Sequence, residues 1–268
     1  GNVTLEAMAC GLPAVNAISL AAPFRWLGGA WSDLVKAPVP CLTYGLALSI
    51  ISILFAMGIY ETNAAYWVLM LTCGFIFIAP MLAMGLYEAG RLIEAGERPT
   101  LARMVLVRSA FRQDIAYLGL MLLVIFTFWI TAAQIVYGLS TYQIHRSVPA
   151  FFTFAFTTDE GRNMLGAGSI IGGLIAFFTY CLVAISTPML LDRDTNVFFA
   201  IATSIRAVNR NFLPMLLWAV IVAVLTLATA ATAFVGMIVI FPLLGLASWR
   251  AYRDIVADRS AALAQAAA

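Results

Sequence analysis

The chain has 268 residues, of which 63% are hydrophobic and 10% charged, and its formal net charge at pH 7 is +2. Soluble globular proteins carry about a quarter charged residues. A soluble fold of this length would therefore lack the polar residues needed to cover its surface. The mean hydropathy of +0.97 favours a protein whose solvent is the lipid bilayer.

The first stretch in chain order, Thr4–Val15 (TLEAMACGLPAV), belongs to a different pattern. It resembles the closing half of the signature of retaining, nucleotide-sugar-dependent glycosyltransferases, in which Glu6 would match the second of two glutamates. That family needs Rossmann sheets around the motif, whereas membrane-type sequence follows shortly after it here. We interpret the match as chance similarity, or as a start that belongs to a neighbouring reading of the gene. Residues 1–20 are expected to form a poorly ordered segment.

The apolar residues that follow are grouped into long runs. A run of roughly 20 apolar residues crosses the ~30 Å hydrocarbon core as a helix. The last run has no charge from Phe212 to Trp249, and one helix of this length would measure about 57 Å. A hairpin turning near 228–232 explains it better than a single helix, although no polar loop marks the turn. The sequence thus predicts six spans, at about 41–60, 64–87, 115–139, 164–191, 212–229 and 232–249.

Positive charge is distributed unevenly over the connections between these spans. Of the 15 Lys and Arg residues, all except Arg146 and Arg162 fall on one side when the segments alternate across the membrane. Cytoplasmic loops carry this excess. Both termini are therefore predicted to be cytoplasmic, with residues 21–257 forming one six-helix domain and 258–268 an Ala-rich tail.

A weak internal repeat divides the spans into three pairs. Each even-numbered span has a proline near its cytoplasmic end, namely Pro80, Pro188 and Pro242. We expect these prolines to kink the helices; the alternative is that they expose carbonyl groups at a transport site. The predicted fold is all-α: a polytopic membrane bundle of three helical hairpins, each preceded by an amphipathic interfacial segment.

The interfacial segments mix apolar and basic residues. The first lies at about 23–34, and the other two carry arginines four residues apart, which share a helix face. Such segments can rest on the acyl boundary while their arginines reach headgroups. The candidate headgroup contacts are Arg108, Arg112, Arg206 and Arg210.

The fourth predicted span contains a motif for close helix packing. Gly168 and Gly172 form a G-x-x-x-G pair, which lets another backbone approach. The neighbour is either another span of this chain, which we favour, or a second copy.

The order of these features resembles a known family. The stretches APFRWLGGAWSDLVKAPVP, IFIAPMLAMGLYEAGRLIEAGERP and SWRAYRDIV are similar to a bacterial family of predicted integral membrane proteins, classed as a domain of unknown function. Its members are often labelled automatically as cytochrome c oxidase subunit I. The resemblance implies a multi-pass protein of the bacterial inner membrane and brings no catalytic residues with it.

The residues of the chain do not fit the oxidase label. Haem and copper centres of that enzyme need several imidazole ligands, and the chain has one histidine, His145, on a predicted outer loop. No hydrolase, phosphate-loop or zinc-protease motif is present. We expect no enzyme activity, no cofactor and no bound metal.

Two functions remain from different classes. The favoured one is a non-enzymatic structural or accessory role in a membrane complex, with lipid and a membrane-protein partner or a second copy as contacts, and no nucleic acid. The alternative is a small-molecule or lipid transporter built on the repeat. The middles of the predicted spans hold no ionisable residues, which favours the first because transport pathways usually contain them.

Overall fold

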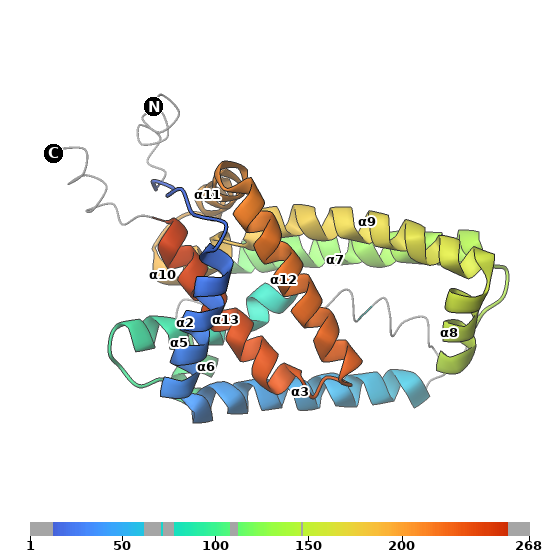
Figure 1. Ribbon diagram of the computed structural model, residues 1–268, viewed down its shortest axis with the longest axis horizontal. Helices are drawn as coiled ribbons and strands as arrows, with labels where there is room; N and C mark the ends of the chain where they lie inside the picture. Colours follow the sequence, from blue (N-terminus) through green and yellow to red (C-terminus); the bar gives the residue numbers. More distant parts are fainter. Residues whose placement is uncertain (1–12, 62–70, 72–77, 108–111, 146, 257–268) are drawn as a thin grey trace.

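A computed structural model describes residues 13–61, 71, 78–107, 112–145 and 147–256 (Figure 1). The described chain is helical throughout, and its only β-type pairing is an isolated bridge between Val15 and Val256. The predicted all-α class is thus confirmed. Most of the second predicted span, 64–87, lies outside the described residues.

The described residues form both long and short helices. In chain order they are α2 (Ala22–Lys36), α3 (Pro38–Glu61), α5 (Met84–Glu94), α6 (Leu101–Val105), α7 (Gln113–Ser140), α8 (Val148–Thr157), α9 (Asp159–Val183), α10 (Ser186–Asp192), α11 (Val197–Arg210), α12 (Phe212–Ala231) and α13 (Met237–Ile255).

The helices divide into a long part and a compact end. The axes of helices α3, α7 and α9 are nearly parallel, and α7 and α9 pack side by side in opposite directions (Figure 1). Helices α2, α5, α10 and α11 gather at one end with residues 247–255 of α13, and we call this group the head. Helix α8 lies at the opposite end (Figure 1).

Four helical segments of the described chain are long and apolar enough to cross a membrane. They are Pro38–Gly58, Gln113–Ser140, Asp159–Asp192 and Phe212–Ala231. These overlap the predicted spans at 41–60, 115–139, 164–191 and 212–229. Helix α13 is not among them, since its last turns carry Arg250, Arg253 and Asp254.

The uncharged stretch 212–249 is two helices. Residues 232–236 form the turn between α12 and α13, and Ala233 and Phe234 adopt positive φ angles of 49° and 66°. Left-handed backbone at non-glycine residues costs about 1–2 kcal/mol each. The turn is therefore held by its surroundings and not by local propensity.

The three prolines occupy different settings. Pro188 lies in α10, just after the break at Ala184 and Ile185 that separates it from α9. Pro242 lies inside α13 and is buried. Pro80 is half-buried and precedes the irregular residue Ala83, after which α5 begins. A proline cannot donate a helical hydrogen bond to the carbonyl four residues before it, which explains the break at Ala184 and Ile185 ahead of Pro188.

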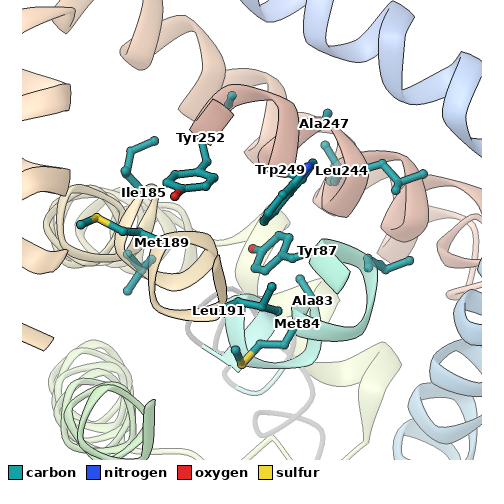
Figure 2. Close-up of a cluster of buried hydrophobic side chains, with 14 of the residues drawn as sticks. Ala83, Met84, Tyr87, Ile185, Met189, Leu191, Leu244, Ala247, Trp249 and Tyr252 are labelled. Atoms are coloured by element: carbon teal, nitrogen blue, oxygen red, sulfur yellow. The ribbon is translucent and has the colours of Figure 1, made fainter. Parts of the chain in front are cut away.

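Helix α13 is the centre of the core. Its buried side chains include Leu244, Trp249 and Tyr252, which pack with Tyr87 of α5 and Met189 of α10 (Figure 2). On another side, α2 packs along α13. The amphipathic segment expected at about 23–34 is thus a helix with one face buried inside the protein.

The amino-terminal residues just before α2 are attached to this core. The amide of Asn16 donates to the carbonyl of Ile255 at 2.8 Å, and the amide of Ile18 donates to Oδ1 of Asn211 at 2.9 Å. Val15 is buried. These contacts belong to the last part of the segment 1–20, whose first twelve residues are outside the described chain.

Two glycines allow close helix crossings. A Cβ atom at Gly45 of α3 would lie 2.4 Å from the carbonyl oxygen of Ile238, the group that Pro242 leaves without its helical donor. A Cβ atom at Gly172 of α9 would lie 2.6 Å from the ring of Trp129 in α7. Gly168 has no such neighbour within 4 Å, so the described contact of this motif is intramolecular and uses one glycine.

Substituting Gly45 tests the α3–α13 crossing. Gly45→Ala should lower the stability of the purified protein by about 1–3 kcal/mol, because the new methyl group must push the two helices apart. Gly58→Ala is the matched control, since a Cβ atom at Gly58 of the same helix meets nothing within 4 Å. Thermal unfolding in detergent measures both variants. Equal midpoints for the two would contradict the close crossing.

Candidate functional site

The charged side chains of the described helices are concentrated in the head. Helix α12 contains none, α3 contains only Glu61 at its end, and α7 contains only Asp114 in its first turn. Charge is costly at membrane depth, so it collects where helices emerge from the bilayer. The charged and polar groups that a functional site requires are therefore found mainly in the head.

Asp33 joins α2 to α13. Its carboxylate accepts a hydrogen bond from Nε of Arg250 at 2.6 Å and contacts Nζ of Lys36 at 3.3 Å. Only 5% of Asp33 is exposed. The hydrogen bond to Asp33 raises the pKa of Arg250 above its ordinary value, so this guanidinium stays charged. Gly29 makes room for it, because a Cβ atom there would lie 2.5 Å from Arg250 Nη1.

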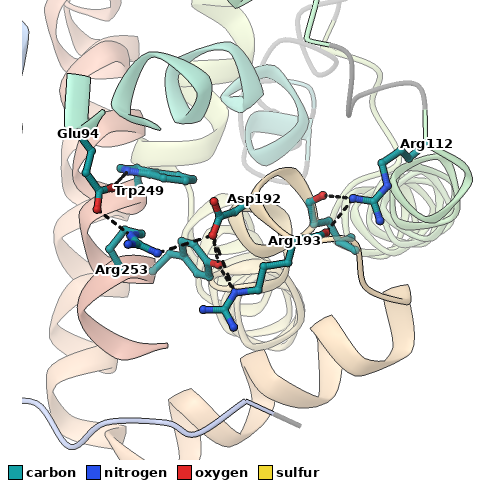
Figure 3. A network of polar contacts seen from close by, with 8 residues as sticks. Glu94, Arg112, Asp192, Arg193, Trp249 and Arg253 are labelled. Carbon is teal, nitrogen blue, oxygen red and sulfur yellow. Dashed lines mark hydrogen bonds and ion pairs between the residues drawn. The ribbon is translucent and has the colours of Figure 1, made fainter. Parts of the chain in front are cut away.

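Glu94 joins α5 to α13. It accepts hydrogen bonds from the indole Nε1 of Trp249 and from Nε of Arg253, both at 3.0 Å (Figure 3). Arg253 also lies 3.8 Å from Asp192 of α10. The carboxylate of Glu94 thus orients one aromatic and one cationic side chain of α13.

Tyr252 connects α13 to α10. Its hydroxyl donates to Asp192 at 2.6 Å and accepts from Nε of Arg193 at 2.8 Å. Burial, and the hydrogen bond to Asp192 after it, raise the pKa of the Tyr252 phenol. The hydroxyl therefore remains protonated and serves as a structural donor.

The same helices enclose a polar groove of about 550 Å³. It lies between α2, α5 and α13, and its walls include the side chains of Trp26, Glu94 and Arg253. The indole of Trp26 donates to Asp254 at 2.9 Å, and Arg25 approaches the same carboxylate at 3.6 Å. The groove therefore presents both signs of charge, already paired with one another.

The polar contacts of the head hold helices together. Within the described residues, no three His, Cys, Asp or Glu side chains are grouped to hold a metal ion. The head's carboxylates accept hydrogen bonds from arginine and tryptophan, which orient them. What the geometry supports is the attachment of four helices to one another at one end of the protein.

The predicted headgroup arginines have three different settings. Arg112 donates to the carbonyls of Leu190 and Arg193 at 3.1 and 2.8 Å and pairs with Asp194, so it ties the start of α7 to the end of α10 (Figure 3). Arg206 has a buried Nη1 atom with no hydrogen-bond partner within the described chain. Arg210 is exposed at the end of α11, and Arg108 lies outside the described residues.

His145 is positioned by aromatic neighbours at the end opposite the head. Its ring stacks on Phe154 with centroids 4.3 Å apart, and its Nδ1 lies 3.1 Å from the hydroxyl of Tyr137. That hydroxyl also accepts from the His145 amide at 3.0 Å. These contacts give the histidine a role in holding the loop between α7 and α8.

The polar contacts that join distant parts of the chain in the head could not be found from the sequence. Asp33 and Arg250 are more than two hundred residues apart, as are Trp26 and Asp254. A usable signal existed in α2, where Asp33 falls on the same helix face as the buried Trp26 and Ala30. A carboxylate on the buried face of a helix requires a partner.

Apolar helices with a charged head of this kind define an integral membrane protein. Residues 68–192 match the family described as "Predicted integral membrane protein (DUF2189)". The predicted resemblance to such a family is confirmed for these residues. No curated protein and no solved structure matches the chain.

The Asp33–Arg250 pair is testable by removing one charge. Asp33→Asn keeps the shape of the side chain and should cost about 1–2 kcal/mol, below the usual upper range for a bond to a charged group because Arg250 is 38% exposed. The measurement is the unfolding midpoint in detergent.

Asp159→Asn provides the matched control. Asp159 pairs with Arg162 at the opposite end, where the two side chains are 85% and 54% exposed. Its loss should change stability by at most ~0.5 kcal/mol. If the Asp33 variant were as stable as the Asp159 variant, the head would not depend on this pair.

Proposed function

We propose that this protein is a non-enzymatic, multi-pass protein of the bacterial inner membrane with a structural or accessory role in a membrane complex. The observation that carries the proposal is the pairing of charged side chains between α2, α5, α10 and α13, which leaves a platform of attached helices in place of a reactive site. Asp33, Glu94 and Asp192 all accept hydrogen bonds or ion pairs from neighbouring helices.

The proposed orientation has the head in the cytoplasm. Lys36, Arg91, Arg193 and Arg250 lie there, whereas Arg162 is on α9 at the opposite end. The excess of basic residues on cytoplasmic segments supports this orientation. The first and last described residues, 13 and 256, lie at the head, and both termini are proposed to be cytoplasmic as well.

Helix α2 has a surface suited to the membrane interface. At about 100° per residue, Phe24, Trp31 and Val35 share one side of the helix, and each is more than half exposed. Arg25 and Lys36 flank that side, while Trp26 and other side chains opposite are buried against α13. Aromatic and aliphatic groups beside basic ones are typical of helices that lie in the interface.

Helix α11 offers a headgroup contact of the same kind. Phe198 and Phe199 are exposed near its start, and Arg206 and Arg210 lie one turn apart near its end. A lipid phosphate is the acceptor that we propose for Arg210, which is exposed at the end of α11, with the half-buried Arg206 one turn before it.

The partner surface is proposed on the apolar sides of the spans. Leu123 and Val124 of α7 and Leu174 of α9 are among the side chains that stay more than half exposed. Lipid covers such surfaces, and a helix of a membrane-protein partner or of a second copy can replace it through close packing.

The transporter alternative receives less support. Near the break before Pro188, the buried hydroxyls of Ser186 and Thr187 donate to the carbonyls of Leu182 and Val183, and Ser204 accepts from the Ile185 amide. These hydroxyl groups form hydrogen bonds with the backbone where the helix is interrupted. They are thereby engaged and do not present free ligands for a substrate.

Photo-crosslinking in the native membrane tests the accessory role. A photoreactive amino acid at Val124, Leu174 or Val220 reports on α7, α9 and α12, because each of these side chains is exposed. The proposal predicts a discrete protein adduct of constant stoichiometry from one of these helices. The yield of this adduct should fall when neighbouring exposed residues of that helix are changed, while the protein itself remains folded.

Pro188→Ala separates the two functions. If the protein has an accessory role, the Pro188→Ala variant should form the same crosslinked adduct as the unaltered protein. The host cells should also grow at the same rate. If all three positions gave only lipid adducts and Pro188→Ala changed the uptake of a solute at unchanged protein level, the transporter hypothesis would replace ours.

A further inference from the structure

The α12–α13 pair reaches only part of the way along α3. The two helices form a V that opens toward the head, with its tip against α3 (Figure 1). At the tip, the hydroxyl of Ser49 donates to the carbonyl of Phe234 at 2.8 Å. Next to it, Ser52 contacts the sulfur of Met237 at 3.6 Å. The tip is thus attached to α3 at these two serines.

Ser49 lies at the middle of α3. That helix has 24 residues, from Pro38 at the head to Glu61. Its length is about 36 Å, so Ser49 lies about 18 Å from either end. A helix of this length crosses the hydrocarbon core, and its midpoint therefore lies near the centre of the bilayer. The turn bound to Ser49 lies at the same depth.

The backbone of the turn is satisfied without water. Each amide from residue 232 to 237 donates inside the turn: in chain order the acceptors are the carbonyls of Ala228, Ala230, Thr229 and Thr232, the hydroxyl of Thr232, and the carbonyl of Phe234. An unpaired amide in hydrocarbon costs several kcal/mol. This complete pairing is what a turn within the bilayer requires.

The exposed side chains of the tip are also suited to lipid. Val235 is 57% exposed, and Ala231 and Ala233 are exposed beside it. The nearest charged residues along the chain are Arg210 and Arg250, and both belong to the head. The hydroxyl of Thr232 donates to the carbonyls of Ala228 and Thr229, so it brings no unsatisfied polar group.

We infer that α12 and α13 form a re-entrant hairpin, which enters the membrane from the head side, turns at residues 232–236 in the hydrocarbon core and returns. The tip is a surface that contacts lipid acyl chains. The expected fifth and sixth spans are replaced by this hairpin, while the two ends of the pair remain on one side. The position of the tip therefore distinguishes the two topologies.

Cysteine labelling of the tip in intact and permeabilised vesicles tests the inference. In a variant with its native cysteines replaced, Val235→Cys should react with a membrane-impermeant maleimide from neither side. Tyr142→Cys and Ser32→Cys are the matched controls for the far end and the head, since both residues are exposed. A nitroxide attached to the Val235→Cys variant should be relaxed by oxygen more than by a water-soluble nickel complex. Labelling of this variant at position 235 from either side would overturn the re-entrant hairpin.

A second pair of variants keeps the test independent of the cysteine. Thr232→Val removes the hydroxyl that accepts from Gly236, so an amide is left unpaired in lipid, and the thermal midpoint should fall clearly. Thr232→Ser restores the acceptor and should restore the midpoint. Equal midpoints for the valine and serine variants would mean that water reaches the turn, which contradicts the proposal.

Discussion

The attachment of helices through paired charges at the head is the interaction on which the rest of the structure depends. The carboxylates of Asp33, Glu94 and Asp192 bind α2, α5 and α10 to the same last turns of α13. Charge–charge hydrogen bonds gain strength where water is excluded, provided that each charge is paired. Because α13 contacts α2, α3 and α5, this one helix transmits the arrangement of the head to the membrane part.

The second constraint is the lack of water along the apolar helices. Backbone groups in hydrocarbon must find partners within the protein, and the breaks in the chain show how this is done. Ser204 accepts from the Ile185 amide where α9 ends, and Ser49 donates to the Phe234 carbonyl where α12 turns into α13. Hydroxyl side chains thus complete the hydrogen bonding at places where a helix is interrupted. Their positions follow from the interruptions and do not require a substrate.

Sequence patterns predicted the apolar helices and missed how they assemble. Composition and run length were sufficient for the helical class and for four helices long and apolar enough to cross a membrane, because hydrophobic length is a local property. The role of α13 was missed, since Trp249, Tyr252 and Arg253 look like an ordinary end of a span until their partners Glu94 and Asp192 are known. Arg112 resembled a surface arginine, although carbonyls of α10 and its following residue surround it. Contacts between residues so far apart in the chain leave no periodic signal.

Hydrogen–deuterium exchange of the protein in lipid nanodiscs tests most directly whether the head is one unit. If ion pairs through Asp33 and Glu94 hold it together, amides of α2, α5 and residues 249–255 should exchange at one slow common rate. In Asp33→Asn, all three groups should then exchange faster together. Fast exchange of α2 in the unaltered protein, while α13 remains protected, would contradict the account.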